Sequence, residues 1–226
     1  MKARYVAGAQ LELLLDPDAA LWSSAGSEHL KLEGTPLGMQ PTDAIRSSWA
    51  DKKIGAVAGV DVEALHDGRH LAFRLEWSDP TENRAVDDND RFADAAAIAL
   101  PSQEGSPLVT MGAPGLAVNA WYWRADDEDP GREVVSEGLG TTRTLDPPTV
   151  KCRGSWRAGR WRVVIARELR VESAEPVAQL TPGEATGFGI AIWDGGSSER
   201  AGLKAVSGFQ WEILEIGAAK KGGEQA

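Results

Sequence analysis

The sequence is poor in cysteine, with a single one, Cys152, among its 226 residues. An internal disulfide needs two cysteines, and an iron–sulfur cluster held by one chain needs about four thiolates. A covalently attached c-type haem needs a CxxCH motif, and the sequence contains none. Any redox cofactor that this chain holds by itself is therefore expected to be bound non-covalently.

Basic residues and long apolar runs are also scarce. Lysine and arginine number 24 against 34 aspartates and glutamates, which gives a formal net charge of −10. We expect no nucleic-acid partner, because nucleic-acid binding needs basic side chains that neutralise phosphates. No stretch approaches the roughly 18 consecutive apolar residues of a membrane helix, so no membrane span is expected. Residues 1–22 lack the apolar core of a signal peptide, so we expect none on this chain.

Helical periodicity is rare, whereas the alternation typical of β-strands recurs. Residues 70–77 alternate between apolar and polar side chains, and Asp67-Gly68 joins this run to the preceding one in a hairpin pattern. Further strands are expected at 92–100, 118–124, 149–156, 160–169, 186–193 and 205–215. Residues 149–156 and 160–169 are expected to form a second hairpin across Arg157-Ala158-Gly159. The longest loops are expected at 17–53, 79–91, 125–148 and 194–204.

This pattern predicts a mainly all-β fold, an antiparallel β-sandwich with long loops and one or two short helices. We find no linker or internal repeat, so residues 1–226 are expected to form a single domain. The last residues, GAAKKGGEQA, predict a flexible tail from about residue 217.

Carboxylates gather in two runs, 79–94 and 125–130. Oxygen ligands suit hard cations such as Ca²⁺. Neither run has the spacing of an EF-hand loop, with its central glycine and terminal glutamate. We therefore interpret both runs as solvated acidic loops.

Nine tryptophans are many for a chain of this length. Exposed tryptophans beside carboxylates on a β-sandwich could stack on sugar rings, so a carbohydrate-binding module is one candidate function. The alternative is that the tryptophans fill the core. Both interpretations stay open for Trp121, Trp123 and Trp193, which lie at strand ends beside glycine-rich loops.

Residues 107–124, PLVTMGAPGLAVNAWYWR, place Met111 in a turn rich in glycine and proline. A lone methionine usually fills space in a core. Lys204, in SSERAGLKAVSG, would by itself be a surface lysine. Neither residue alone indicates a site.

Four segments, taken in order, resemble one known family. They are WSDPTENRAVDDNDRFADAAAIALP, TMGAPGLAVNAWYWRAD, SWRAGRWRVVIARELR and FGIAIWDGGSSERAGLKAVSGF. They resemble the haem b-binding γ subunits of type II enzymes in the dimethyl sulfoxide reductase family. Ethylbenzene dehydrogenase, steroid C25 dehydrogenase, dimethylsulfide dehydrogenase, and chlorate and selenate reductases belong to this family. The resemblance runs from about residue 5 to residue 215.

The resemblance implies a non-covalent haem b whose iron has two axial ligands, a methionine in the TMG turn and a lysine after the AIWDGG strand. These positions are Met111 and Lys204 in this sequence. The amine of a lysine binds iron only when neutral, so such a site must lower its pKa. Further haem contacts are expected from Gly112, Asn119, Trp121, Trp123 and Trp193.

The resemblance also implies a function and partners. The chain would be a non-catalytic electron-transfer subunit beside an α subunit with molybdenum bis-molybdopterin guanine dinucleotide and a β subunit with Fe–S clusters. Its acceptor would be a protein such as cytochrome c. The N-terminal segment resembles the ethylbenzene and steroid C25 dehydrogenase subfamily, which hydroxylates a hydrocarbon or a steroid side chain with water. In that subfamily the γ subunit reaches the periplasm together with a partner that bears a twin-arginine signal.

Overall fold

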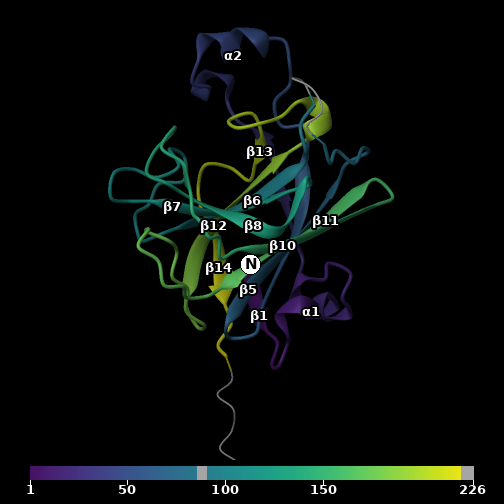
Figure 1. Ribbon diagram of the computed structural model, residues 1–226, viewed down its shortest axis with the longest axis vertical. Coiled ribbons are helices and arrows are strands. Elements are labelled where there is room, and N and C mark those ends of the chain that lie inside the picture. Colours follow the sequence, from purple (N-terminus) through teal and green to yellow (C-terminus); the bar gives the residue numbers. More distant parts are fainter. Residues whose placement is uncertain (86–90, 220–226) are drawn as a thin grey trace, which may run out of the picture.

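β-Strands dominate the computed structural model of this chain, which describes residues 1–85 and 91–219, without the side chains of 128–130 (Figure 1). The strands are β1 (Lys2–Tyr5), β2 (Glu28–Lys31), β3 (Glu33–Gly34), β4 (Gly59–His66), β5 (His70–Ser78), β6 (Ala95–Pro101), β7 (Val118–Arg124), β8 (Asp127–Ser136), β9 (Arg143–Thr144), β10 (Lys151–Arg157), β11 (Arg160–Glu168), β12 (Ala185–Trp193), β13 (Ala205–Val206) and β14 (Glu212–Ile216). Two short α-helices accompany them, α1 (Leu11–Leu15) and α2 (Asp43–Ser48). No helix in the described ranges has the length and apolar character needed to cross a membrane.

The strands form one ladder that folds into two facing layers. Its order is β10-β11-β5-β4-β1-β14-β12-β6-β7-β8-β9, and β1 joins the two halves because it pairs in parallel with both β4 and β14. The other pairs are antiparallel. Aromatic rings meet between the layers, since Phe73 of β5 lies 6.2 Å from Trp121 of β7 and 5.8 Å from Phe188 of β12. The prediction of a mainly antiparallel β fold with two short helices is confirmed.

Both predicted hairpins are present. Asp67 closes the turn between β4 and β5, where its Oδ1 accepts hydrogen bonds from the backbone N–H groups of Arg69 (2.7 Å) and His70 (2.6 Å). The turn between β10 and β11 uses Ala158 and Gly159, both with positive φ angles, 51° and 76°. Such angles suit a two-residue hairpin turn, because they match the twist of the flanking strands.

Three predicted boundaries differ from the structure. The predicted strand 205–215 is two strands, β13 and β14, and β8 lies where the sequence predicted a loop. Gly217, at the start of the predicted tail, is buried and donates a hydrogen bond to the carbonyl oxygen of Ala3 (2.9 Å). Residues 220–226 of that predicted tail lie outside the described residues.

His66, at the end of β4, is fully buried and predicts a pH effect on stability. Neither ring nitrogen has a hydrogen-bond partner of normal geometry, and burial lowers the pKa of His66 below its ordinary value of 6.5. Below about pH 6.5 the unfolded chain binds a proton here that the folded chain resists, so stability falls. We expect His66→Gln to lose less stability than the wild type between pH 7 and 5, measured by urea unfolding. The exposed His29, changed to Gln, is the control, and equal pH slopes in wild type and His66→Gln would contradict the prediction.

Candidate functional site

β12 presents a different set of side chains on each of its two faces. Phe188, Ile190 and Ile192 point into the core between the layers and are buried. The side chains on the opposite face, here called the outer face, are small. On β12, β6 and β7 the outer face includes Gly187, Gly189, Ala191, Trp193, Ala95, Ala97, Ala99, Ala120, Tyr122 and Arg124, which pair across neighbouring strands. The outer face is therefore flat and mostly apolar, with Trp193 and Tyr122 at one end, their rings 5.3 Å apart.

The turn that carries Met111 covers the other end of this face. Leu108, in the same turn, packs against Gly189, where an added Cβ would lie 3.0 Å from a Leu108 methyl carbon. The backbone N–H of Met111 donates to the carbonyl oxygen of Leu108 (2.9 Å), and the Met111 carbonyl accepts from Gly138 (3.0 Å). These contacts fix the backbone of the half-buried Met111 between Leu108, which packs on Gly189 of β12, and Gly138, which follows β8.

Met111 has an unusual backbone conformation, with a φ of 54°. Residues other than glycine rarely adopt positive φ, and such strain persists where the surroundings enforce it, often at ligand sites. Gly112 enforces it here, because its φ is 93° and a Cβ on it would overlap the carbonyl oxygen of Ser136. The predicted site residue Gly112 thus lets the turn pack closely against the end of β8.

Lys204 lies beside Trp193 at the far end of the outer face. Its Nζ is 4.9 Å from the centre of the Trp193 ring, and the Trp193 Nε1–H donates to the carbonyl oxygen of Ala201 (3.0 Å). Among the described residues no carboxylate pairs with Lys204. Burial lowers the pKa of Lys204 to about 8. The site therefore favours the neutral amine far more than water does.

Glu199 holds the loop that presents Lys204. This buried carboxylate accepts hydrogen bonds from the backbone N–H groups of Gly55 (2.6 Å), Ala56 (3.0 Å) and Asp194 (3.1 Å). The backbone of Lys204 is fixed as well, because its carbonyl oxygen accepts from the N–H of Thr35 (3.0 Å). The side chain of Lys204 is thus attached to a backbone that hydrogen bonds hold in place.

The donor set of this face fits a haem. Gly189, under the Met111 turn, and Trp193, under Lys204, are four residues apart on β12, which is roughly 13 Å along a strand. A thioether and an amine that can lose its proton thus approach one apolar face from two ends. Thioethers are soft ligands that iron accepts in cytochromes, and a neutral amine has a free lone pair. The alanines between them would leave room for a flat apolar group.

Three predicted haem contacts lie on the wrong face for this site. Asn119, Trp121 and Trp123 of β7 point into the core and are buried. Trp123 stacks edge-on against Trp161 at 4.8 Å, and the Asn119 Oδ1 accepts from the Trp121 Nε1–H at 3.2 Å. The expectation that these three residues contact a cofactor stays a prediction, and they are not part of the outer face. Trp193 alone among the three tryptophans lies on the outer face.

Two residues of this region were not among the predicted site residues. Tyr122 lies between Trp121 and Trp123 in β7, so its side chain points to the opposite face, the outer face. The alternation of the strand already indicates that Tyr122 and the two tryptophans lie on different faces. Trp211 covers Gly187, where an added Cβ would lie 2.8 Å from the indole, and its Nε1–H donates to the carbonyl oxygen of Ser106 (2.8 Å). Gly187 and Gly189 thus pack against the bulky side chains of Trp211 and Leu108.

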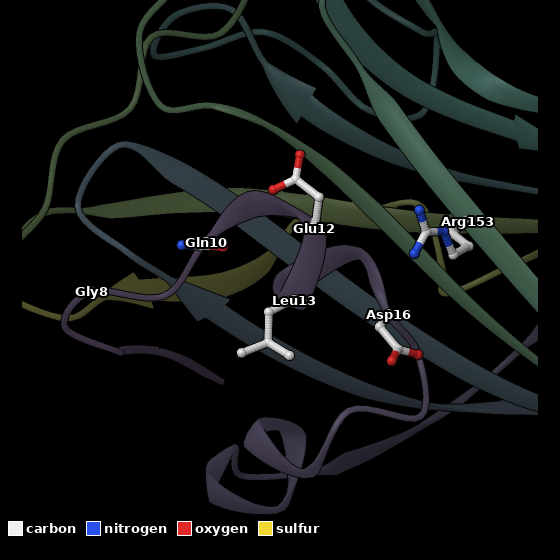
Figure 2. Close-up of a pocket in the computed structure, with 6 residues that line it drawn as sticks. All are labelled: Gly8, Gln10, Glu12, Leu13, Asp16 and Arg153. Atoms are coloured by element: carbon white, nitrogen blue, oxygen red, sulfur yellow. The ribbon is translucent and has the colours of Figure 1, made fainter.

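A hollow of about 450 Å³ lies elsewhere, beside α1 and β10 (Figure 2). It is lined by Gly8, Gln10, Glu12, Leu13, Asp16 and Arg153. Figure 2 shows Glu12 and Leu13 pointing to opposite sides of α1, with Arg153 across the hollow. None of the predicted site residues lines it, and we assign no function to it.

Two named relatives are similar to this chain over most of its length. A chlorate reductase γ subunit from Ideonella dechloratans is 34% identical over 200 residues, which is 87% of this chain and 78% of the relative. A protein named as a respiratory nitrate reductase haem subunit, from Haloferax mediterranei, is 29% identical over 207 residues, or 91% of this chain and 70% of the relative.

The fold and the family are also established by comparison. A family 9 carbohydrate-binding module from Caldicellulosiruptor kristjanssonii, solved with glucose, superposes with a TM-score of 0.52 over 99% of this chain and 98% of that one. Its identity is 8%, so it shows the shared β fold alone. The family described as ethylbenzene dehydrogenase matches residues 19–147 and 139–205. The resemblance predicted from the four sequence segments is confirmed, and the chain belongs to the ethylbenzene dehydrogenase family.

Proposed function

We propose that this chain is the haem b-bearing electron-transfer subunit of a multi-subunit molybdoenzyme, with the whole of residues 1–226 forming one haem domain. The observation that carries the proposal is the placement of the turn that contains Met111, and of Lys204, toward the two ends of one mostly apolar face. Support comes from relatives that are named as a γ subunit of chlorate reductase and a haem subunit of nitrate reductase. Because these relatives are γ or haem subunits of oxidoreductase complexes, the chain acts as a non-catalytic subunit.

Each side chain has a defined task in this proposal. When bound, the haem supplies a one-electron carrier. Met111 contributes a neutral thioether, which favours Fe(II) and raises the reduction potential. Lys204 contributes its amine, which burial makes easier to deprotonate, and a metal charge lowers its pKa further. Trp193, Tyr122 and the alanines exclude water from the face.

The partners and location in this proposal follow from the family resemblance. The chain would receive electrons from a β subunit with Fe–S clusters, next to an α subunit with molybdenum bis-molybdopterin guanine dinucleotide. It would pass them to an acceptor such as cytochrome c in the periplasm, after co-export with a partner that bears a twin-arginine signal. The complex would hydroxylate a hydrocarbon or a steroid side chain with water. The two named relatives belong to reductases.

Carbohydrate binding, the alternative from the sequence, lacks its main requirement. All nine tryptophans lie in the described part of the chain, and none of them is exposed. Trp156 and Trp211 are half-buried, and each gives its indole N–H to a backbone carbonyl, Asp79 and Ser106 respectively. No tryptophan therefore offers a free ring face on which a sugar could stack.

The test is an ultraviolet–visible spectrum of the purified complex, oxidised and dithionite-reduced, with a pyridine haemochrome assay. We expect one haem b per chain and sharp reduced α and β bands in the wild type. Met111→Leu and Lys204→Leu keep most of the side-chain volume but remove the donor atom, so both should lose most of the haem or become high-spin. Loss in Met111→Leu alone would contradict ligation by Lys204.

Two matched controls separate ligation from general damage. Met39 is half-buried and outside the site, and Lys52 lies 5.3 Å from the Trp49 ring, much as Lys204 lies over Trp193. Met39→Leu and Lys52→Leu should keep the wild-type spectrum. A wild-type complex without a haem band would refute the proposal.

A further inference from the structure

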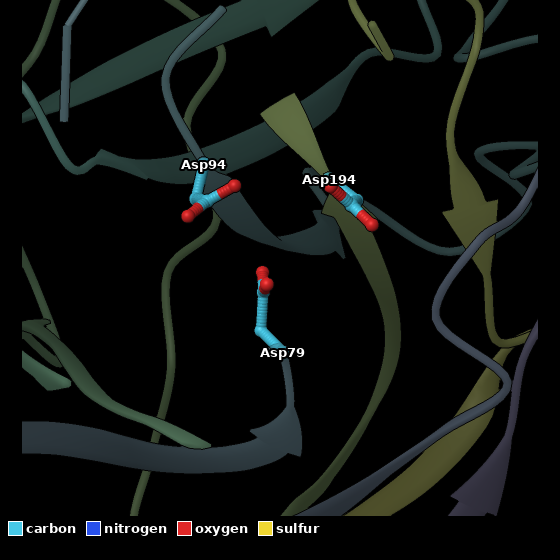
Figure 3. Close-up of side chains that lie close together, drawn as sticks. All are labelled: Asp79, Asp94 and Asp194. Carbon is cyan, nitrogen blue, oxygen red and sulfur yellow. The ribbon is translucent and has the colours of Figure 1, made fainter. Parts of the chain in front are cut away.

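Three aspartates meet at a point that the haem proposal does not use. Asp79 follows β5, Asp94 precedes β6 and Asp194 follows β12, and Figure 3 shows their carboxylates directed toward one another. One carboxylate oxygen from each residue lies within 4.8 Å of the other two. The interpretation of 79–94 as a solvated acidic loop is wrong at both ends, because Asp79 is 1% exposed and Asp94 is fully buried.

Hydrogen bonds from neighbouring residues hold two of these carboxylates, those of Asp94 and Asp194, in place. Asp94 accepts from the Trp161 Nε1–H (2.9 Å) and from the backbone N–H groups of Asn83 (2.8 Å) and Gly195 (2.9 Å). Asp194 accepts from the N–H and the hydroxyl of Ser197, both at 3.0 Å. Such bonds fix the direction of the oxygens, but they leave three negative charges facing each other.

The unsatisfied atom in this cluster is the Asp79 Oδ2. This oxygen is buried and has no hydrogen-bond partner. The indole N–H of Trp77 lies near this carboxylate, but the two groups do not form a hydrogen bond of normal geometry. A buried carboxylate oxygen without a partner is costly, so it points to a missing ligand. Among the described residues no lysine, arginine or histidine forms an ion pair with any of the three aspartates.

We propose that Asp79, Asp94 and Asp194 form a Ca²⁺ site at the base of the loop that presents Lys204. Calcium takes six to eight oxygen ligands at about 2.3–2.6 Å, so two ligand oxygens are at most about 5 Å apart. Further oxygens are at hand, since Asn83 Oδ1 and Thr81 Oγ1 each lie 3.0 Å from where a Cβ on Gly196 would be. Magnesium is the poorer match because it keeps several waters and binds few protein oxygens.

The electrostatics of the cluster agree with a bound cation. Burial, together with the charge of a neighbouring aspartate, raises the pKa of Asp94 to about 7 and that of Asp79 to about 6. A divalent cation offsets this repulsion and fixes the end of β12 to the ends of β5 and β6. The inference stands apart from the haem, because it uses none of the proposed haem contacts.

The test uses the full chain, treated with EGTA and then titrated with CaCl2, followed by calorimetry and thermal unfolding. We expect one Ca²⁺ per chain and a melting temperature that rises by roughly 5–10 °C at saturating Ca²⁺. Asp79→Asn should abolish the Ca²⁺ response while melting no lower than the wild type in EGTA, because it removes a repelling charge. Asp51→Asn, at an exposed position, should respond like the wild type.

Three outcomes would overturn the assignment. One is a chain that binds no Ca²⁺ and melts at the same temperature in EGTA and CaCl2, as expected if Asp79 and Asp94 share a proton instead. Another is Asp79→Asn with the full wild-type response. The third is an equal response to MgCl2, which would exclude a calcium site.

Discussion

Replacing Glu133 by glutamine is expected to lower the free energy of unfolding by about 3–5 kcal/mol, the usual cost of breaking a buried ion pair. Glu133 and Arg167 are both fully buried, and their side chains meet at 2.8 Å. Burial lowers the pKa of Arg167 despite this partner, yet the guanidinium stays charged. Without the carboxylate, a charge would remain in the core with no counter-ion.

The pair belongs to a network that makes the loss larger. Arg167 also donates to the Oδ1 of Asn119 (3.1 Å) and to the carbonyl oxygen of Ala178. Glu133 accepts from the Asn119 Nδ2 (3.1 Å) and from the Thr149 hydroxyl (2.5 Å). The Arg167 guanidinium lies 4.8 Å from the centre of the Trp121 ring. A change at Glu133 therefore disturbs contacts among three strands, β7, β8 and β11, and the two loop residues Thr149 and Ala178.

Urea unfolding of three variants checks this expectation. The double variant Glu133→Leu with Arg167→Met should be more stable than Glu133→Gln, because neither charge is then left alone. Glu168→Gln is the control, since Glu168 pairs with Arg69 at an exposed site and should change little. A Glu133→Gln protein within about 1 kcal/mol of the wild type would show that Arg167 is compensated in another way.

Local patterns predicted much of the fold. Alternation located β5, β7, β11 and β12, and turn residues located both hairpins. β8 was missed because it begins DEDPG, and aspartate, proline and glycine are rare in strands. Pairing with β7 and the burial of Glu133 and Val135 stabilise β8, and these are tertiary effects that a local pattern does not contain.

The candidate site depended on different information. Met111 and Lys204 are single residues in loops, so family resemblance identified them and no periodicity could. Alternation separates Trp121 and Trp123 from Tyr122, but it leaves open which side faces the core. The sequence could not predict the cluster of Asp79, Asp94 and Asp194 either, because these residues lie at the ends of three separate strands.

The second large effect is expected at Gly195, directly after Asp194. A Cβ here would overlap the carbonyl oxygen of Phe92, and backbone atoms cannot move aside as a flexible side chain can. We expect Gly195→Ala to lower the free energy of unfolding by roughly 3 kcal/mol, the upper range for overpacking. The substitution would also push the Gly195 N–H away from Asp94, with which it now forms a 2.9 Å hydrogen bond.

Gly195→Ala also tests whether the position of Lys204 depends on this loop independently of the overall stability of the chain. Glu199 and Gly195 anchor the same loop, so a shifted loop should misplace Lys204, and the proposed haem should be lost at temperatures where the chain is still folded. Gly26→Ala is the control, because a Cβ there meets nothing within 4 Å. Circular dichroism and the haem spectrum are measured on the same samples. A Gly195→Ala chain with wild-type stability would mean that Phe92 yields, and the loop would then be less firmly fixed than its contacts indicate.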